Sequence, residues 1–201
     1  MVRKIVLATK NVGKIAEMQR LLDSLGLELH VISSSEFNLA DVEETGSSFE
    51  ANAIIKATTI ARATGLLAIA DDSGLCVDAL DGAPGIYSAR WAGEHGNDLA
   101  NIALVLEQLS STADSSRGGD FVCAIALALP DGSVEVVRGE LHGVLRREPV
   151  GEYGFGYDPI FQPDGFNVTL AQMTPSEKDA ISHRGRALRE IAPRIASFIA
   201  R

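Results

Sequence analysis

Two adjacent carboxylates, Asp71 and Asp72, follow an apolar run in the segment LAIADDSG. Residues 66–70 are typical of a buried strand, and ligands of α/β sheets usually bind just past the carboxyl ends of the strands. Mg²⁺ typically takes one or two carboxylates, water and the phosphates of a substrate. Because side chains alternate along an extended chain, one aspartate can face a ligand while the other supports the backbone. The pair is a candidate metal-phosphate site, and an Asx-turn that closes the strand is the alternative.

A second candidate site lies between a predicted first strand and the helix that follows it. It comprises Thr9, Lys10, Asn11, Val12, Gly13 and Lys14. A tight turn there directs free backbone N–H groups and the positive end of the helix dipole at whatever binds above it. The two lysines oppose that dipole, and a bound anion would remove the conflict. The Walker A pattern is absent, since Ala8 and Ile15 stand at its glycine and Ser/Thr positions. An ordinary turn with solvated lysines is the alternative.

An acidic loop, residues 41–46 (DVEETG), precedes a predicted helix. Most such loops are solvated charge. A carboxylate of this loop, Glu43 or Glu44, would matter chemically if folding brings it beside Asp72 to share a cation.

The segment GFGYDP, residues 154–159, combines glycines with aromatic rings. Gly154 and Gly156 permit close approach of the backbone to a flat ligand. Phe155 or Tyr157 can stack on such a ligand. Asp158 can accept a hydrogen bond from a ring N–H. The alternative is a packed aromatic turn that ends at a proline.

Lys178 and the run Ser182-His183-Arg184 form a basic group near the end of the chain. On one helix, residues 178 and 182 would share a face. His183 is a poor general base because the neighbouring arginine disfavours its protonation, so it suits a hydrogen bond to a ligand better. A basic surface helix is the alternative. No Ser-His-Asp or Cys-His arrangement stands out, which gives covalent catalysis little support.

These candidates must be positioned by the surrounding elements. Residues 4–8 and 27–32 predict strands around a helix over 12–25, and the spacing S-x-x-E at Ser47 predicts a helix to about Thr64. Further predicted elements are a helix over 99–109, antiparallel strands over 121–129 and 134–147, a helix from Thr174, and a terminal helix broken or kinked at Pro193. The pattern predicts an α/β protein with a long mixed sheet and one domain over residues 1–201.

Composition narrows the class of protein. The formal net charge of −9 weighs against binding to nucleic acid or to an anionic membrane. The apolar runs are too short to span a bilayer, and the N-terminus lacks a secretory apolar region, so we expect a cytoplasmic protein. Cys76 and Cys123 are interpreted as reduced thiols, and no zinc-site spacing is present.

In this order, the motifs resemble one family, the inosine/xanthosine triphosphate pyrophosphatases. The resemblance covers essentially the whole chain. The matching motifs are Thr9-x-Asn11-x-x-Lys14, Glu43-Glu44-Thr45-Gly46, Ala70-Asp71-Asp72-Ser73-Gly74, GAPGIYSAR over residues 82–90, Phe155-Gly156-Tyr157-Asp158-Pro159 and Ser182-His183-Arg184-Gly185.

The resemblance implies an elongated mixed sheet flanked by helices, two lobes with a central nucleotide cleft, and a homodimer. It implies that ITP, dITP or XTP is hydrolysed to the monophosphate and pyrophosphate with Mg²⁺, which keeps these nucleotides out of DNA and RNA. The implied catalytic residue is Asp72, which is also a metal ligand, with Glu43 as the second metal ligand. The implied phosphate-binding residues are 9–14, Ser73 and Lys178. The implied base-binding residues are 155–158, His183 and Arg184.

Selectivity against ATP has a physical interpretation. Hypoxanthine and xanthine carry an oxygen where adenine carries an amino group, so donors from Arg184, His183 or backbone N–H groups would face another donor if ATP bound. Two other hypotheses stay open: a pyrophosphatase for other modified nucleotides, and a purine nucleotide sensor without catalysis. Whether Asp72 acts as base or metal ligand also stays open.

Overall fold

The computed structural model describes residues 3–9 and 11–199. Six strands form one mixed sheet in the order β2-β1-β3-β4-β5-β6. The chain divides into two compact units, the first formed by residues 1–72, 123–139 and 184–201 and the second by residues 73–122 and 140–183. Strands β3 (Ala68–Val77), β4 (Gly118–Ala128) and β5 (Val134–Leu145) contribute residues to both.

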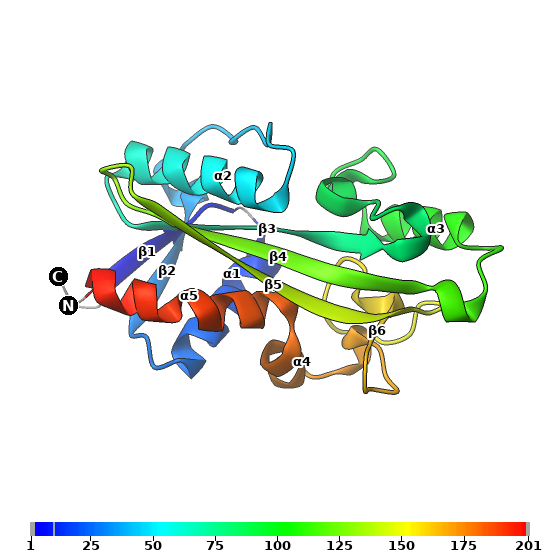
Figure 1. Cartoon of the computed structure of the whole chain (residues 1–201). Helices are drawn as coiled ribbons and strands as arrows, with labels where there is room; N and C mark the ends of the chain where they lie inside the picture. Colours follow the sequence, from blue (N-terminus) through cyan, green and yellow to red (C-terminus); the bar gives the residue numbers. More distant parts are fainter. Residues whose placement is uncertain (1–2, 10, 200–201) are drawn as a thin grey trace. The chain divides into compact units, whose positions relative to one another are not determined.

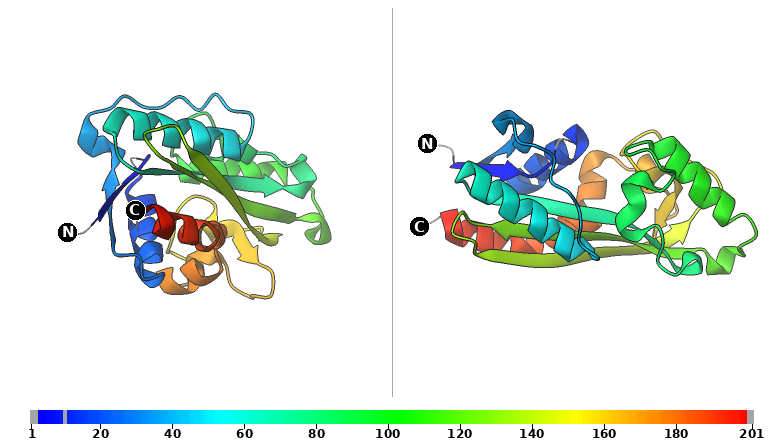
Figure 2. Two further views of the ribbon diagram at one scale, coloured as in Figure 1. Left: turned by 60° about the vertical axis from the view of Figure 1, so that its left-hand side comes forward. Right: turned by 90° about the horizontal axis from the view of Figure 1, so that it is seen from above.

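The first unit opens with the predicted β-α-β arrangement. Strand β1 (Arg3–Leu7) pairs in parallel with β2 (Leu29–Ser33) and with β3, and α1 (Val12–Ser24) connects β1 to β2. Helices α1 and α5 (His183–Ile199) cover one face of the sheet, and α2 (Phe49–Thr64) covers the other (Figures 1 and 2). The face under α1 and α5 holds large apolar side chains such as Ile5, Ile69 and Leu127.

The face under α2 is built from small side chains. Ala53 and Ala57 of α2 and Ala68 and Ala70 of β3 are all fully buried. Small residues let a helix backbone approach a sheet closely, so polar side chains of α2 can reach the strand beneath them. The helix begins one residue later than the serine-glutamate spacing predicts, because Ser48 is the residue that caps it.

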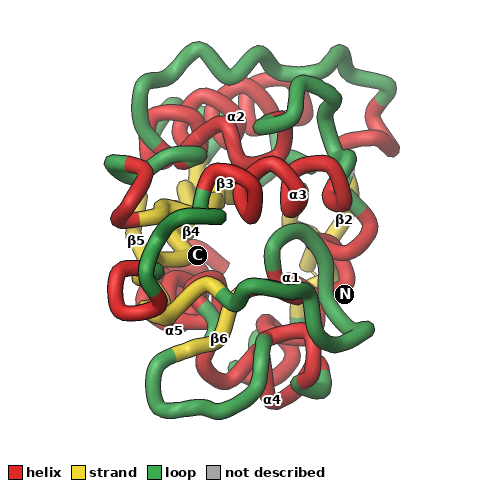
Figure 3. Tube along the Cα trace, turned by 90° about the vertical axis from the view of Figure 1, so that its right-hand side faces the viewer, coloured by secondary structure: helices red, strands yellow, loops and turns green. Residues whose placement is uncertain are grey.

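The second unit adds α3 (Asp98–Gln108), β6 (Phe161–Pro163) and α4 (Pro175–Ile181). Loops connect most of these elements, as the green segments in Figure 3 show. Leu75, Phe121 and Leu141 of the sheet form a core with Val105 of α3 and with Ile160.

Two predictions about elements are wrong. The strand that carries the aspartates does not end at residue 70, because β3 continues through both of them to Val77. Residues 178 and 182 do not share one helix, since Ser182 is extended (φ −60°, ψ 152°) and separates α4 from α5. Of the two alternatives predicted for the terminal helix, a break is excluded because α5 continues through Pro193, and a kink there stays a prediction.

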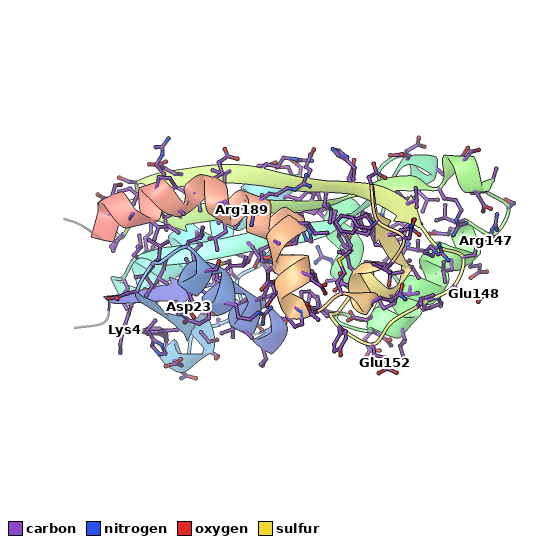
Figure 4. All side chains as sticks on the ribbon, turned by 90° about the horizontal axis from the view of Figure 1, so that it is seen from below. Lys4, Asp23, Arg147, Glu148, Glu152 and Arg189 are labelled. Carbon is purple, nitrogen blue, oxygen red and sulfur yellow. The ribbon has the colours of Figure 1, made fainter. Side chains whose placement is uncertain are left out.

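Exposed charged side chains cover the surface of each unit. Lys4, Asp23 and Arg189 are exposed in the first unit, and Arg147, Glu148 and Glu152 in the second (Figure 4). Within residues 3–9 and 11–199, no helix is both long enough and apolar enough to cross a membrane. Both cysteines are free thiols, Cys123 buried and Cys76 partly so.

Candidate active site

Asp71 and Asp72 point to opposite faces of the sheet. Because β3 is extended at both positions, successive side chains alternate. Asp71 contacts Lys14 of α1 and Arg184 of α5, whereas Asp72 contacts residues of α2. The two carboxylates are both buried, yet each has its own partners.

Asp71 belongs to a buried ion-pair network. Its Oδ2 lies 2.9 Å from Lys14 Nζ and 2.8 Å from Arg184 Nη2, and Arg184 Nη1 lies 2.5 Å from Glu17 Oε2. Burial alone would raise the pKa of Asp71, but the neighbouring cations, above all Lys14, hold it well below its usual range. Asp71 is therefore an ionised structural anchor for α1 and α5.

Asp72 has the opposite electrostatic character. Its Oδ1 lies 3.1 Å from Lys56 Nζ, and its Oδ2 accepts a hydrogen bond from Asn52 Nδ2 at 3.1 Å. Burial raises its pKa, Lys56 opposes this rise, and the nearby charge of Glu44 adds to it. Two adjacent aspartates whose environments shift their pKa values in opposite directions are suited to different roles.

The acidic loop brings Glu44, rather than Glu43, to this carboxylate. Lys56 Nζ lies 2.7 Å from Glu44 Oε1, so one ammonium group bridges Glu44 and Asp72. The loop backbone is held too, since Gly46 N donates to Asn52 Oδ1 at 2.8 Å. A Cβ at Gly46 would lie only 2.7 Å from that oxygen. Glu43 is exposed, so Glu44 is the carboxylate of the acidic loop that lies beside Asp72, and the metal role of either glutamate stays a prediction.

The predicted phosphate segment forms the turn into α1. Asn11 caps the helix by accepting from Lys14 N at 3.1 Å, and Asn11 N donates to Thr9 Oγ1 at 3.2 Å. Val12 and Gly13 occupy the exposed first turn, where backbone N–H groups have no partner within the helix. Lys10 lies outside the described residues. The described part of the segment thus has the geometry of an anion-binding helix N-terminus.

In the second unit, residues 154–158, here termed the aromatic loop, contact Lys178 through two side chains. Lys178 Nζ lies 4.6 Å from the centroid of the Phe155 ring and 2.5 Å from Asp158 Oδ2. Asp158 Oδ2 also accepts from Phe155 N at 2.9 Å. The lysine expected to bind phosphate therefore lies with the predicted base-binding residues.

Tyr157 and Gly156 anchor the aromatic loop to other segments. The Tyr157 hydroxyl donates to Ser88 O at 2.9 Å, and its ring is 4% exposed. Burial, aided by the charge of Asp98, raises the pKa of Tyr157, so the hydroxyl keeps the proton that it donates. Gly156 N donates to Asp98 Oδ2 at 2.7 Å. Phe155, which is only half-buried, is the ring of the loop that is better placed to meet a ligand.

The run Ser182-His183-Arg184 is divided between the two units. His183 stacks on Phe121 with ring centroids 4.8 Å apart, in the second unit. Arg184 is 1% exposed in the first unit, with its guanidinium bound to Glu17 and Asp71. This geometry argues against Arg184 as a side-chain contact to a base and for a role in holding Asp71. The ligand roles of His183 and Ser73 stay predictions.

Sequence reasoning missed Asn52, Lys56 and Glu17. A signal was present for the first two, which are polar residues four apart on a buried helix stripe. The other members of the stripe are apolar: Phe49, Ala53, Ala57, Ile60 and Ala61. Polar side chains on a buried stripe need partners, so they indicate a buried polar cluster. The sequence analysis used only the start and end of that helix.

Carboxylates beside lysines suit the binding of Mg²⁺ and phosphate, and a half-buried aromatic ring on a glycine loop suits stacking on a base. The chain belongs to the Ham1 family, whose sequence model matches residues 5–194. The resemblance drawn from the motifs is confirmed.

The similarity to individual relatives extends over nearly the whole chain. A protein of Streptomyces avermitilis named dITP/XTP pyrophosphatase is 52% identical over 197 residues, which are 98% of each chain. The crystal structure of a nucleoside-triphosphatase, or dITP/XTP pyrophosphatase, from Mycobacterium abscessus is 50% identical, has a TM-score of 0.76 and covers 96% of this chain and 99% of its own. The structure of a HAM1 protein from Coxiella burnetii is 46% identical and has a TM-score of 0.86. The match covers 97% of this chain and 99% of the Coxiella chain.

Proposed function

We propose that this protein hydrolyses dITP, ITP and XTP to the nucleoside monophosphate and pyrophosphate. The observation that carries the proposal is the pair of carboxylates, Asp72 and Glu44, held on one ammonium group of Lys56. Relatives about half identical to this chain are named dITP/XTP pyrophosphatase, which supports the proposal.

Groups suited to the phosphate chain lie around Asp72 and at the N-terminus of α1. A nucleoside triphosphate brings about four negative charges, which a protein of net charge −9 must offset locally. Lys14 and the N-terminus of α1 can bind phosphate oxygens, and Lys56 adds a buried positive charge beside Asp72. In-line attack by water requires positioning and charge neutralisation more than covalent help. Asp72 orients the attacking water, and because a metal-bound carboxylate stays ionised, its contribution beside Mg²⁺ is positioning rather than proton transfer.

We also propose that Mg²⁺ binds, with two carboxylates of the protein as its ligands. Within the described part of the chain, no group of three or more His, Cys, Asp and Glu side chains is placed to hold a metal ion. Two carboxylates completed by water and substrate phosphates are nevertheless a usual Mg²⁺ arrangement. Asp72 and Glu44 would hold the ion, which when bound supplies positive charge against the developing charge on the phosphates.

The aromatic loop is proposed to bind the base. Phe155 offers a ring for stacking, and the Lys178–Asp158 pair beside it offers polar groups for the edge of a purine. Lys178 donates hydrogen bonds and cannot accept them, so it favours a six-position oxygen over an amino group. A homodimer and a cytoplasmic location are also kept as proposals, on the strength of the sequence resemblance.

A pyrophosphate-release panel tests the function. We expect dITP, ITP and XTP to be hydrolysed much faster than dATP and dUTP, with turnover that requires Mg²⁺ and is lost in Asp72→Asn. Fast turnover of dUTP but not dITP would favour a different modified nucleotide as substrate. Binding of dITP without release of pyrophosphate would favour the sensor hypothesis.

A further inference from the structure

The backbone of the aromatic loop depends on side chains for its hydrogen bonds. Gly154 and Gly156 have φ values of +78° and +61°, in the left-handed region that favours glycine. Phe155 N donates to Asp158 within the loop, and Gly156 N donates to Asp98, which lies 58 positions away in the sequence. These two N–H groups are therefore already occupied by carboxylates and are not donors for the oxygen of a purine.

Asp98 stands on a rigid support. It is the first residue of α3, a helix whose Ile102 and Val105 are packed into the core of the second unit. The helix does not need the Asp98 carboxylate as a cap, because Asn97 caps it by accepting from Ala100 N at 3.1 Å. The Asp98 carboxylate thus extends from a fixed helix to the Gly156 N–H group.

We propose that Asp98 is a positioning residue for base binding, an inference that rests on the proposed nucleotide function. The peptide group that joins Phe155 to Gly156 is held by Asp98 at 2.7 Å, and the orientation of this peptide sets the direction of the Phe155 side chain. The negative charge of Asp98 also reaches Tyr157 in the same loop, where it contributes to the raised pKa of that hydroxyl. Asp98 therefore acts on the base through the loop.

Steady-state kinetics with dITP provide the first test, using Asp98→Ala, Asp98→Asn and the control Glu94→Ala. Glu94 lies in the same segment and accepts from Asn97 rather than from the aromatic loop. Loss of a hydrogen bond to a charged group predicts a rise in KM of about tenfold or more in Asp98→Ala, with kcat within about twofold of wild type. Asp98→Asn keeps an acceptor oxygen and should remain within about threefold of the wild-type KM. Glu94→Ala should leave both constants unchanged.

Calorimetric binding of two ligands separates positioning from general loss of structure. Asp98→Ala should weaken the binding of dIMP, which carries the base, and leave the binding of pyrophosphate, which lacks it, unchanged. An unchanged KM and dIMP affinity would overturn the inference. Equal weakening of both ligands, or failure of Asp98→Asn to restore binding, would reduce Asp98 to a stabilising residue and also overturn it.

The same measurements distinguish failure of the proposed function. If wild-type protein binds dIMP but releases no pyrophosphate from any nucleotide, the pyrophosphatase function fails while the binding comparison still decides the role of Asp98. If it binds neither dIMP nor dITP, both proposals are overturned.

Discussion

Glu44 and Asp72 share one ammonium group, with Lys56 Nζ 2.7 Å from Glu44 Oε1 and 3.1 Å from Asp72 Oδ1. The lysine is 8% exposed, and although burial alone would lower its pKa, the carboxylates around it raise the pKa. Two carboxylates from different segments are therefore kept close by a charge that remains positive at neutral pH. This arrangement joins the acidic loop to β3 through α2.

Replacing Asp72 should separate catalysis from stability. Asp72→Asn keeps the volume of the side chain but removes its charge, so we expect kcat for dITP to fall about 100-fold or more. The folded-state pKa of Asp72 is raised above the unfolded value, so its ionised form lowers the free energy of unfolding at neutral pH. The variant should accordingly be at least as stable as wild type in urea at pH 7. A kcat within about threefold of wild type would remove Asp72 from the chemistry.

Replacing Asp71 should lower stability, in contrast to replacing Asp72. Asp71→Asn leaves Lys14 and Arg184 facing an uncharged amide, and breaking such a buried pair should lower the free energy of unfolding by about 3 kcal/mol at pH 7.

The pH dependence of that loss provides a second measurement. The folded-state pKa of Asp71 is depressed, so its stabilising contribution is full above the unfolded pKa of about 3.9 and is lost as the pH falls through the folded value. Urea titrations should show a constant gap between wild type and Asp71→Asn from about pH 5 to 8, and a narrowing gap below about pH 4. A gap that stays constant down to pH 3 would contradict the assigned ion pairs.

Replacing Lys56 should expose the repulsion between the two carboxylates. Lys56→Met removes the shared ammonium group, so the melting temperature should fall, and added Mg²⁺ should restore part of the loss by supplying positive charge. Thermal melts with EDTA or Mg²⁺, without nucleotide, measure this directly. The matched comparison is Lys4→Met, at an exposed position, whose melting temperature should not depend on Mg²⁺. Equal Mg²⁺ responses in the two variants would argue against a cation site at these carboxylates.

Replacing Arg184 tests whether it holds Glu17 and Asp71 by ion pairs, as the structure indicates, or contacts the base, as the sequence suggested. Arg184→Met should lower the free energy of unfolding by at least about 3 kcal/mol, because Glu17 and Asp71 lose a buried partner. The double variant with Glu17→Gln should lose less than the sum of the two single losses. Among folded molecules, the ratio of dITP to dATP turnover should not change. A smaller ratio of dITP to dATP turnover in the variant would support contact between Arg184 and the base.

Much of the fold was predictable because it depends on local patterns. The apolar runs and helical stripes predicted the β-α-β opening, the hairpin of β4 and β5, and the helices α1 and α2 to within a few residues. The errors fell where local signals compete with pairing. Adjacent aspartates and a glycine indicated the end of a strand, but pairing within the sheet carried β3 on to Val77.

The sequence alone determined the family, the chemical classes of the candidate residues and the motifs in which they stand, because these depend on residue type and spacing. The tertiary structure alone decided which charges meet. It paired Asp71 with Lys14 and Asp72 with Lys56, brought Glu44 rather than Glu43 to Lys56, and buried Arg184 against Glu17. The physical reason is that ion pairs form between side chains far apart in the sequence, and their partners and pKa values follow from burial and distance.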